Sequence, residues 1–153
     1  MRASRLGRYS WTMFDWANQP FYTLIMTFVF SVYFTDVFIA GEDGAQKLTL
    51  TQTISGLAIA LLSPVLGSIT DIKGSRKLLM GITSALFVLG MALLWYSPPG
   101  APDGIWLVMF GLILASAMVG FSEVFNNSVL STIETPENSG WLSGMGYGVG
   151  YIA

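Results

Sequence analysis

Four long apolar runs divide this chain and constrain its fold more than any other feature. They cover residues 20–39, 50–69, 78–96 and 105–130, and a fifth run extends from about residue 139 to residue 153. A bilayer core of about 30 Å requires roughly 20 helical residues at 1.5 Å each. The runs therefore predict an all-α, polytopic transmembrane helix bundle with four complete spans and an incomplete fifth. Because the sequence stops inside an apolar run, we expect residues 1–153 to be the amino-terminal part of a longer membrane protein.

The composition supports a membrane environment and excludes several kinds of chemistry. Hydrophobic residues make up 53% of the chain and charged residues 10%, whereas soluble domains carry about 25% charged residues. The net charge of −2 offers no basic surface for nucleic acid. Histidine and cysteine are absent, which removes the commonest general base and the usual metal ligands. Ser143 could serve as a nucleophile only with a base to activate it, so we expect neither an enzyme nor a cofactor or metal.

The cations indicate how the spans are oriented. Lysine and arginine accumulate on the cytoplasmic side of membrane proteins. Six of the seven cations fall on one side of the predicted spans, and Lys47 falls on the other. The six are Arg2, Arg5 and Arg8 before the first span, and Lys73, Arg76 and Lys77 between the second and third. We therefore expect a cytoplasmic amino terminus.

A cleaved signal peptide is the alternative interpretation of the first run. Its apolar core of about 20 residues is longer than the usual 7–15. Phe38 also stands where a small residue would precede the cut after Ala40. These features favour a first run that remains in the protein as a membrane span.

A charged turn joins the second and third runs and resembles a known signature. The major facilitator superfamily carries a pattern close to G-x-x-x-D-R/K-x-G-R/K-R/K in the loop between its second and third helices. The matching residues are Gly67, Asp71, Gly74, Arg76 and Lys77, whereas Ile72 and Ser75 depart from the pattern. The resemblance implies a gating loop that latches the inner ends of helices. The same cations can instead serve only to set topology, and the sequence leaves both interpretations open.

A second resemblance is narrower and covers nearly the whole chain. The start of the first span is similar to the Tyr/Phe-Asp-Trp-Ala-Asn-x-x-Phe motif of the vacuole-effluxer family within the same superfamily. The residues that carry it are Phe14-Asp15-Trp16-Ala17-Asn18 and Phe21. Further similarity lies at Phe125-Asn126-Asn127-Ser-Val-Leu130, Thr135-Pro136-Glu137 and Ser143-Gly144-Met-Gly146-Tyr-Gly148. The resemblance implies about twelve helices, a missing carboxyl-terminal half, amino acids as possible substrates, and a bacterial plasma membrane or fungal vacuolar membrane.

Two acids within the predicted spans are candidate functional residues. Ionisable groups inside a membrane are costly and usually functional. Asp15 precedes Asn18 by one helical turn, and its alternative role is an interfacial or helix-capping residue. Glu123 shares a helix face with Asn126 and Asn127 at i+3 and i+4. We predict that these five residues belong to a transport or proton pathway, although Glu123 could instead pair with a partner helix.

Small and aromatic residues suggest how the helices pack and anchor. In lipid, helices approach most closely at small side chains. We expect packing faces at Gly56, Ala60, Ser63 and Gly67, and at two faces of the fifth run, Gly140/Gly144/Gly148 and Gly146/Gly150. Aromatic residues gather at membrane interfaces. We expect Trp95, Tyr96 and Trp106 in an outer aromatic belt and Trp141 in an inner one.

Together these features lead to one functional hypothesis and one alternative. The hypothesis is a secondary transporter of a small polar solute that works by alternating access. Its partners would be the lipid bilayer, a small-molecule substrate and the missing carboxyl-terminal half, so the 153-residue chain would not transport alone. The alternative is a four-helix membrane scaffold or accessory protein without transport activity.

Overall fold

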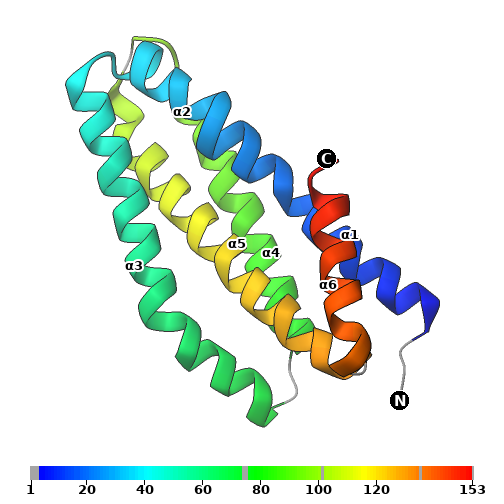
Figure 1. The fold of residues 1–153 in the computed structure, drawn as a ribbon. Coiled ribbons are helices and arrows are strands. Elements are labelled where there is room, and N and C mark those ends of the chain that lie inside the picture. Colours follow the sequence, from blue (N-terminus) through cyan, green and yellow to red (C-terminus); the bar gives the residue numbers. More distant parts are fainter. Residues whose placement is uncertain (1–3, 74–75, 101, 135, 153) are drawn as a thin grey trace.

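The chain folds into a bundle of long helices, as the apolar runs predict (Figure 1). The computed structural model describes residues 4–73, 76–100, 102–134 and 136–152. Every regular element in these ranges is helical. Four helical segments are long and apolar enough to cross a membrane: Arg5–Phe38, Glu42–Ser68, Arg76–Tyr96 and Ile105–Leu130. The prediction of an all-α bundle is therefore confirmed.

The first long helix starts well before the first apolar run. It comprises α1 (Arg5–Pro20), η1 (Phe21–Phe28), α2 (Phe30–Tyr33) and η2 (Phe34–Phe38). The Ser4 hydroxyl accepts a hydrogen bond from the Gly7 amide and caps the first turn, as serine commonly does. The helix therefore begins before the predicted span of residues 20–39, because hydropathy marks only the apolar part of a helix whose polar first turn is capped by Ser4.

Two π-helical stretches, η1 and η2, interrupt this helix. The first begins directly after Pro20, whose ring nitrogen cannot donate to the carbonyl four residues earlier. The chain then shifts to i→i+5 bonding, and the Val29 amide donates to the Leu24 carbonyl at 2.9 Å. Such π segments occur often at functional sites. Here the change of register lies just beyond Asp15, one of the candidate residues.

The remaining helices follow with short connections. Gly41 supplies the turn into the second long helix with φ of 94°, a left-handed conformation that glycine adopts without a Cβ clash. The elements are α3 (Glu42–Lys73), α4 (Arg76–Leu93), η3 (Leu94–Tyr96), η4 (Pro102–Gly104), α5 (Ile105–Ile133) and α6 (Pro136–Gly150). Helix α6 starts near the predicted fifth run and lies beside α1 (Figure 1).

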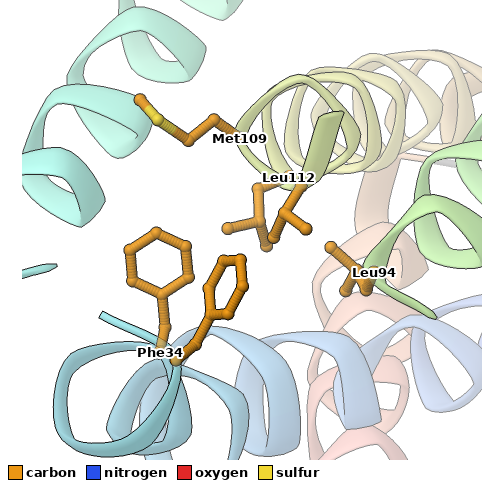
Figure 2. Close-up of a cluster of buried hydrophobic side chains, with 6 residues drawn as sticks. Phe34, Leu94, Met109 and Leu112 are labelled. Carbon is orange, nitrogen blue, oxygen red and sulfur yellow. The ribbon is translucent and has the colours of Figure 1, made fainter. Parts of the chain in front are cut away.

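Helix α5 forms the centre of the bundle and packs against both α3 and α4 (Figure 1). Figure 2 shows the apolar cluster at one end, where Phe34 faces Leu112 of α5 and Leu94 of η3. Phe38, Val108 and Met109 complete its buried members. Two further clusters line α5, one around Ala115 and Val119 and one around Phe121 and Phe125. The apolar contacts therefore extend along α5 from Val108 to Phe125.

Glycines allow the closest contact between α4 and α5. A Cβ placed on Gly90 would lie 2.8 Å from the Ala115 amide nitrogen and 2.8 Å from the Gly111 carbonyl oxygen. Nearby, the Ser122 hydroxyl donates to the Thr83 hydroxyl at 2.7 Å in a buried position. Close backbone approach and hydroxyl pairs are the usual means by which helices associate in lipid.

The predicted glycine faces proved only partly correct. A Cβ on Gly56 or Gly67 would meet nothing within 4 Å, so α3 uses another face, including Ile59, to contact α5 at Gly120. On α6, the Gly146/Gly150 face contacts α1, whereas Gly140, Gly144 and Gly148 have nothing within 4 Å in the described chain. Small residues mark where a neighbour can approach, and the arrangement of the helices decides where one does.

Candidate functional site

A polar pocket lies where α1, α5 and α6 meet. It has a volume of about 100 Å³. Its lining includes two carboxylates, two carboxamides and two phenols, a set that is unusual within membrane-length helices. The lining residues are Asp15 and Gln19 of α1, Glu123 and Asn127 of α5, Tyr147 and Gly150 of α6, and Tyr151.

Asp15 is held in this pocket by contacts with the central helix. The Asn126 side chain donates a hydrogen bond from Nδ2 to Asp15 Oδ1 at 3.4 Å. The Trp11 indole donates to the Asn126 backbone carbonyl at 2.8 Å. Asn126 therefore contacts two successive turns of α1, at Trp11 and at Asp15. Trp11 is only 5% exposed, so its ring is buried between helices. Asp15 lies within α1 and does not cap a helix end.

Glu123 supplies the second carboxylate, from α5. The Tyr22 hydroxyl approaches this carboxylate, and Asp15 lies near enough for the two acids to interact electrostatically. Asn127, one turn along α5, faces the same pocket, although it is exposed. The lining that the structure describes contains no lysine or arginine. Two acids without a basic counterpart suit a proton, a monovalent cation or the ammonium group of a solute.

Not every predicted pathway residue reaches the pocket. Asn126 lies against α1 and acts on Asp15, whereas Asn127 lines the cavity. Asn18 does not line the cavity, and its Nδ2 is buried without a hydrogen-bond partner in the described part of the chain. Buried donors without partners are rare in proteins. Asn18 is therefore close in sequence to Asp15 but does not line the pocket. Its Nδ2 group could donate a hydrogen bond to a group outside the described residues.

A partly buried ion pair joins α1 to the end of α5, at the end of the bundle where α1 begins. Arg8 of α1 donates from Nη1 to Glu134 Oε2, just after α5, at 3.1 Å. The Glu134 side chain is only 2% exposed. In the sequence Glu134 falls in a loop with no neighbouring cation. Nothing local predicts this contact, because the two residues are far apart in the chain and meet only through the packing of α1.

The charged turn is described only in part. Gly67 lies near the end of α3, and Arg76 and Lys77 begin α4. Gly74 and the side chain of Asp71 lie outside the described residues. The beginning of α1, the end of α3 and the beginning of α4 lie toward the same end of the bundle (Figure 1). Arg5, Arg8, Arg76 and Lys77 are thus gathered at that end, but the gating role of the turn remains a prediction.

Sequence reasoning missed the contribution of the last helix to the pocket. Gln19 occupies an unspecified position of the first motif, and Tyr147 lies in the glycine-rich segment that resembles the family, but neither was singled out as a site residue, and nor was Tyr151. A signal did exist for α6, since Gly146 lies on one of the two predicted small faces. A Cβ there would approach Asp15 Oδ2 to 3.0 Å. The glycine permits the contact, and the neighbouring tyrosines then reach the cavity.

The fold and the pocket define a class of protein: a multi-pass helical membrane protein with a polar site between its helices. Within the described residues, no group of three or more acids could hold a metal ion. The site consists of side chains from α1, α5 and α6, together with Tyr151.

Comparison with known proteins connects this class to a family. The chain is 31% identical to an uncharacterised MFS-type transporter of Bacillus subtilis over 149 residues, which is 94% of this chain and 34% of that protein. It is also 32% identical over 133 residues to an uncharacterised protein of Aquifex aeolicus, covering 85% of this chain and 32% of that protein. The chain spans about a third of the length of these curated relatives. The first similarity supports membership in the major facilitator superfamily.

No family model matches the chain, and no solved structure matches it. The narrower resemblance to the vacuole-effluxer family therefore depends on the sequence motifs alone.

Proposed function

We propose that this chain is part of a secondary transporter of the major facilitator superfamily, and that the pocket between α1, α5 and α6 belongs to the path of a small polar solute. The observation that carries the proposal is the pair of carboxylates, Asp15 and Glu123, brought from two separate helices to one cavity. Charged groups within membrane spans are retained where they bind or move ions and solutes. The similarity to a Bacillus transporter supports the same function.

In this proposal the two acids change their charge or their partner during transport. A proton or cation bound between Asp15 and Glu123 relieves the repulsion of two nearby carboxylates. The carboxamides of Gln19 and Asn127 and the phenols of Tyr147 and Tyr151 supply further hydrogen-bonding groups for a solute. Amino acids fit this lining, since their ammonium group matches the acids, and the vacuole-effluxer resemblance favours them as substrates.

The proposed orientation places the amino terminus and the charged turn in the cytoplasm of a bacterium. The described cations at that end of the bundle support it through the positive-inside rule. The turn that includes Gly67, Arg76 and Lys77 would then lie at an inner gate, where loss of its contacts accompanies alternating access.

Transport by the natural gene product containing this chain tests the function. Membrane vesicles are loaded with individual amino acids, and counterflow is measured with and without a proton gradient. We expect Asp15→Asn and Glu123→Gln to lower the flux by about tenfold or more, because each loses a charge-assisted interaction. Asp36→Asn is the matched control, since Asp36 is exposed and hydrogen-bonds only to its neighbour Thr35 in the described chain.

Three outcomes are informative. Unchanged flux at every pH in Glu123→Gln would remove this residue as a proton-linked site. Equal loss in Asp36→Asn would mean that any acid in these helices is required, and the pocket would lose its special role. Absence of flux for every solute tried, in a folded and correctly inserted protein, would favour the scaffold alternative.

A further inference from the structure

A second pocket lies at the end of the molecule where α1 begins, and it is chemically unlike the first. It has a volume of about 200 Å³ and is lined by Arg5, Arg8 and Tyr9 of α1 and by Trp141 and Met145 of α6. None of these residues lines the acidic pocket. The two helices lie side by side here, so both walls of the pocket belong to the packed bundle (Figure 1).

The pocket carries one positive charge that the described chain does not neutralise. Arg8 is paired with Glu134 at 3.1 Å, so that pair is neutral overall. Arg5 is exposed and forms no ion pair with any described residue. The first turn of α1 also contains no acid, and the amide groups at a helix start add a positive partial charge. The pocket therefore attracts an anion.

Aromatic and apolar groups lie beside this charge. Tyr9 is 60% exposed and Trp141 is 66% exposed, while Met145 in the same lining is half-buried. Tyrosine and tryptophan prefer the boundary between headgroups and acyl chains, where one end of the ring is wet. A free inorganic anion would make no use of these apolar surfaces.

The length of the first helix places this pocket at the level of the lipid headgroups. The helical segment Arg5–Phe38 has 34 residues, which corresponds to about 51 Å at 1.5 Å per residue. The hydrocarbon core is about 30 Å thick and the whole bilayer about 40–45 Å. The apolar part of the segment lies toward its carboxyl end, so its first turns extend beyond the hydrocarbon.

From these observations we propose that the pocket binds an anionic phospholipid. The phosphate and headgroup lie against the Arg5 guanidinium and the remaining donors of Arg8, and the upper acyl chain lies against Trp141 and Met145. Arginine provides a planar set of donors suited to phosphate oxygens. This assignment is independent of any transported solute, and it concerns the surface of the α1–α6 pair rather than the acidic pocket.

Fluorescence quenching by brominated lipids tests the proposal on the full chain in mixed micelles. The signal from Trp141 is the difference between the wild-type chain and Trp141→Phe. Brominated phosphatidylglycerol and phosphatidylcholine with identical acyl chains are compared. We expect half-maximal quenching at about fivefold lower mole fraction of the anionic lipid, the preference that one cation near a membrane surface provides. Arg5→Gln is expected to abolish this preference, and Arg5→Lys to keep most of it.

Lys47→Gln is the matched control, because it removes one cation from the opposite end of the bundle, where Lys47 follows Asp43 on α3. It should leave the preference unchanged. Circular dichroism verifies that each variant keeps its helices. Equal quenching by the two lipids, or an unchanged preference in Arg5→Gln, would overturn the proposal. Displacement of the brominated lipid by millimolar inorganic phosphate would assign the pocket to a free anion instead of a lipid.

Discussion

At the scale of single residues, burial determines how much an ion pair contributes to stability. Glu134 is almost fully buried and pairs with Arg8, whereas Asp43 is exposed and pairs weakly with Lys47 at 3.9 Å. Surface ion pairs contribute little because water already solvates both partners. When one member of a buried ion pair is removed, the charge that remains is still desolvated but has lost its partner, which destabilises the fold. The two pairs in this chain therefore differ in energy although both join an acid to a base.

This difference gives a prediction for stability. We expect Glu134→Gln to lower the free energy of unfolding by about 1.5–3 kcal/mol, since it removes a charged hydrogen bond from a buried position. Asp43→Asn should change it by less than about 0.5 kcal/mol, because it breaks an exposed i,i+4 pair. Thermal or denaturant unfolding of both variants in the same detergent measures the contrast. Equal effects would show that Glu134 is solvated in the membrane-inserted protein.

At the scale of helices, Gly90 of α4 and Gly111 of α5 determine how closely these two helices can approach each other. The backbone of α5 occupies the space that a Cβ at Gly90 would require, whereas Gly81 on the same helix has nothing within 4 Å. A flexible side chain can turn away from an added methyl group, but a helical backbone can do so only if the two helices separate. Separation would also disturb the buried hydrogen bond between Ser122 and Thr83.

Alanine at these two positions should therefore have opposite effects. We expect Gly90→Ala to destabilise the protein by about 1–3 kcal/mol through overpacking. Gly81→Ala should be neutral or stabilising by up to about 1 kcal/mol, because alanine favours the helix more than glycine does. Melting temperatures of the two variants in detergent provide the measurement. A neutral Gly90→Ala would mean that the helices of the membrane-inserted protein are farther apart than described here.

At the scale of the whole molecule, the bundle leaves large apolar surfaces uncovered. Leu57, Leu61 and Val65 of α3 are exposed, as expected for a helix that faces lipid or other helices. The acidic pocket is bordered by α1, α5 and α6, with no described helix across from them. In the proposed function, alternating access requires two bodies that move against each other around such a site. The described chain forms one body.

The corresponding prediction concerns the 153-residue chain by itself. Purified and reconstituted into liposomes, it is expected to insert as a helical protein but to give no solute flux above that of empty liposomes. The natural gene product containing it should give flux under the same conditions. Measurable uptake by the chain alone would contradict the proposal that transport needs a second body, while leaving the acidic pocket as a candidate site.

Hydropathy by itself determined that this chain is an all-α membrane protein, because the cost of placing polar groups in lipid is summed along a local stretch of residues. The same local reasoning singled out Asp15 and Glu123, since an acid in an apolar run is conspicuous. It failed for Glu134 and Trp11, whose roles depend on residues more than a hundred positions away.

Only the tertiary structure decided which faces of the helices meet. Gly146 contacts α1, whereas Gly144, on the same helix, faces open space. The sequence does not distinguish Gly146 from Gly144, because a helix face that contacts lipid and one that contacts another helix are equally apolar. The composition of both pockets follows from that choice of faces. A side chain such as Tyr147 or Trp141 becomes part of a site only when another helix forms the opposite wall.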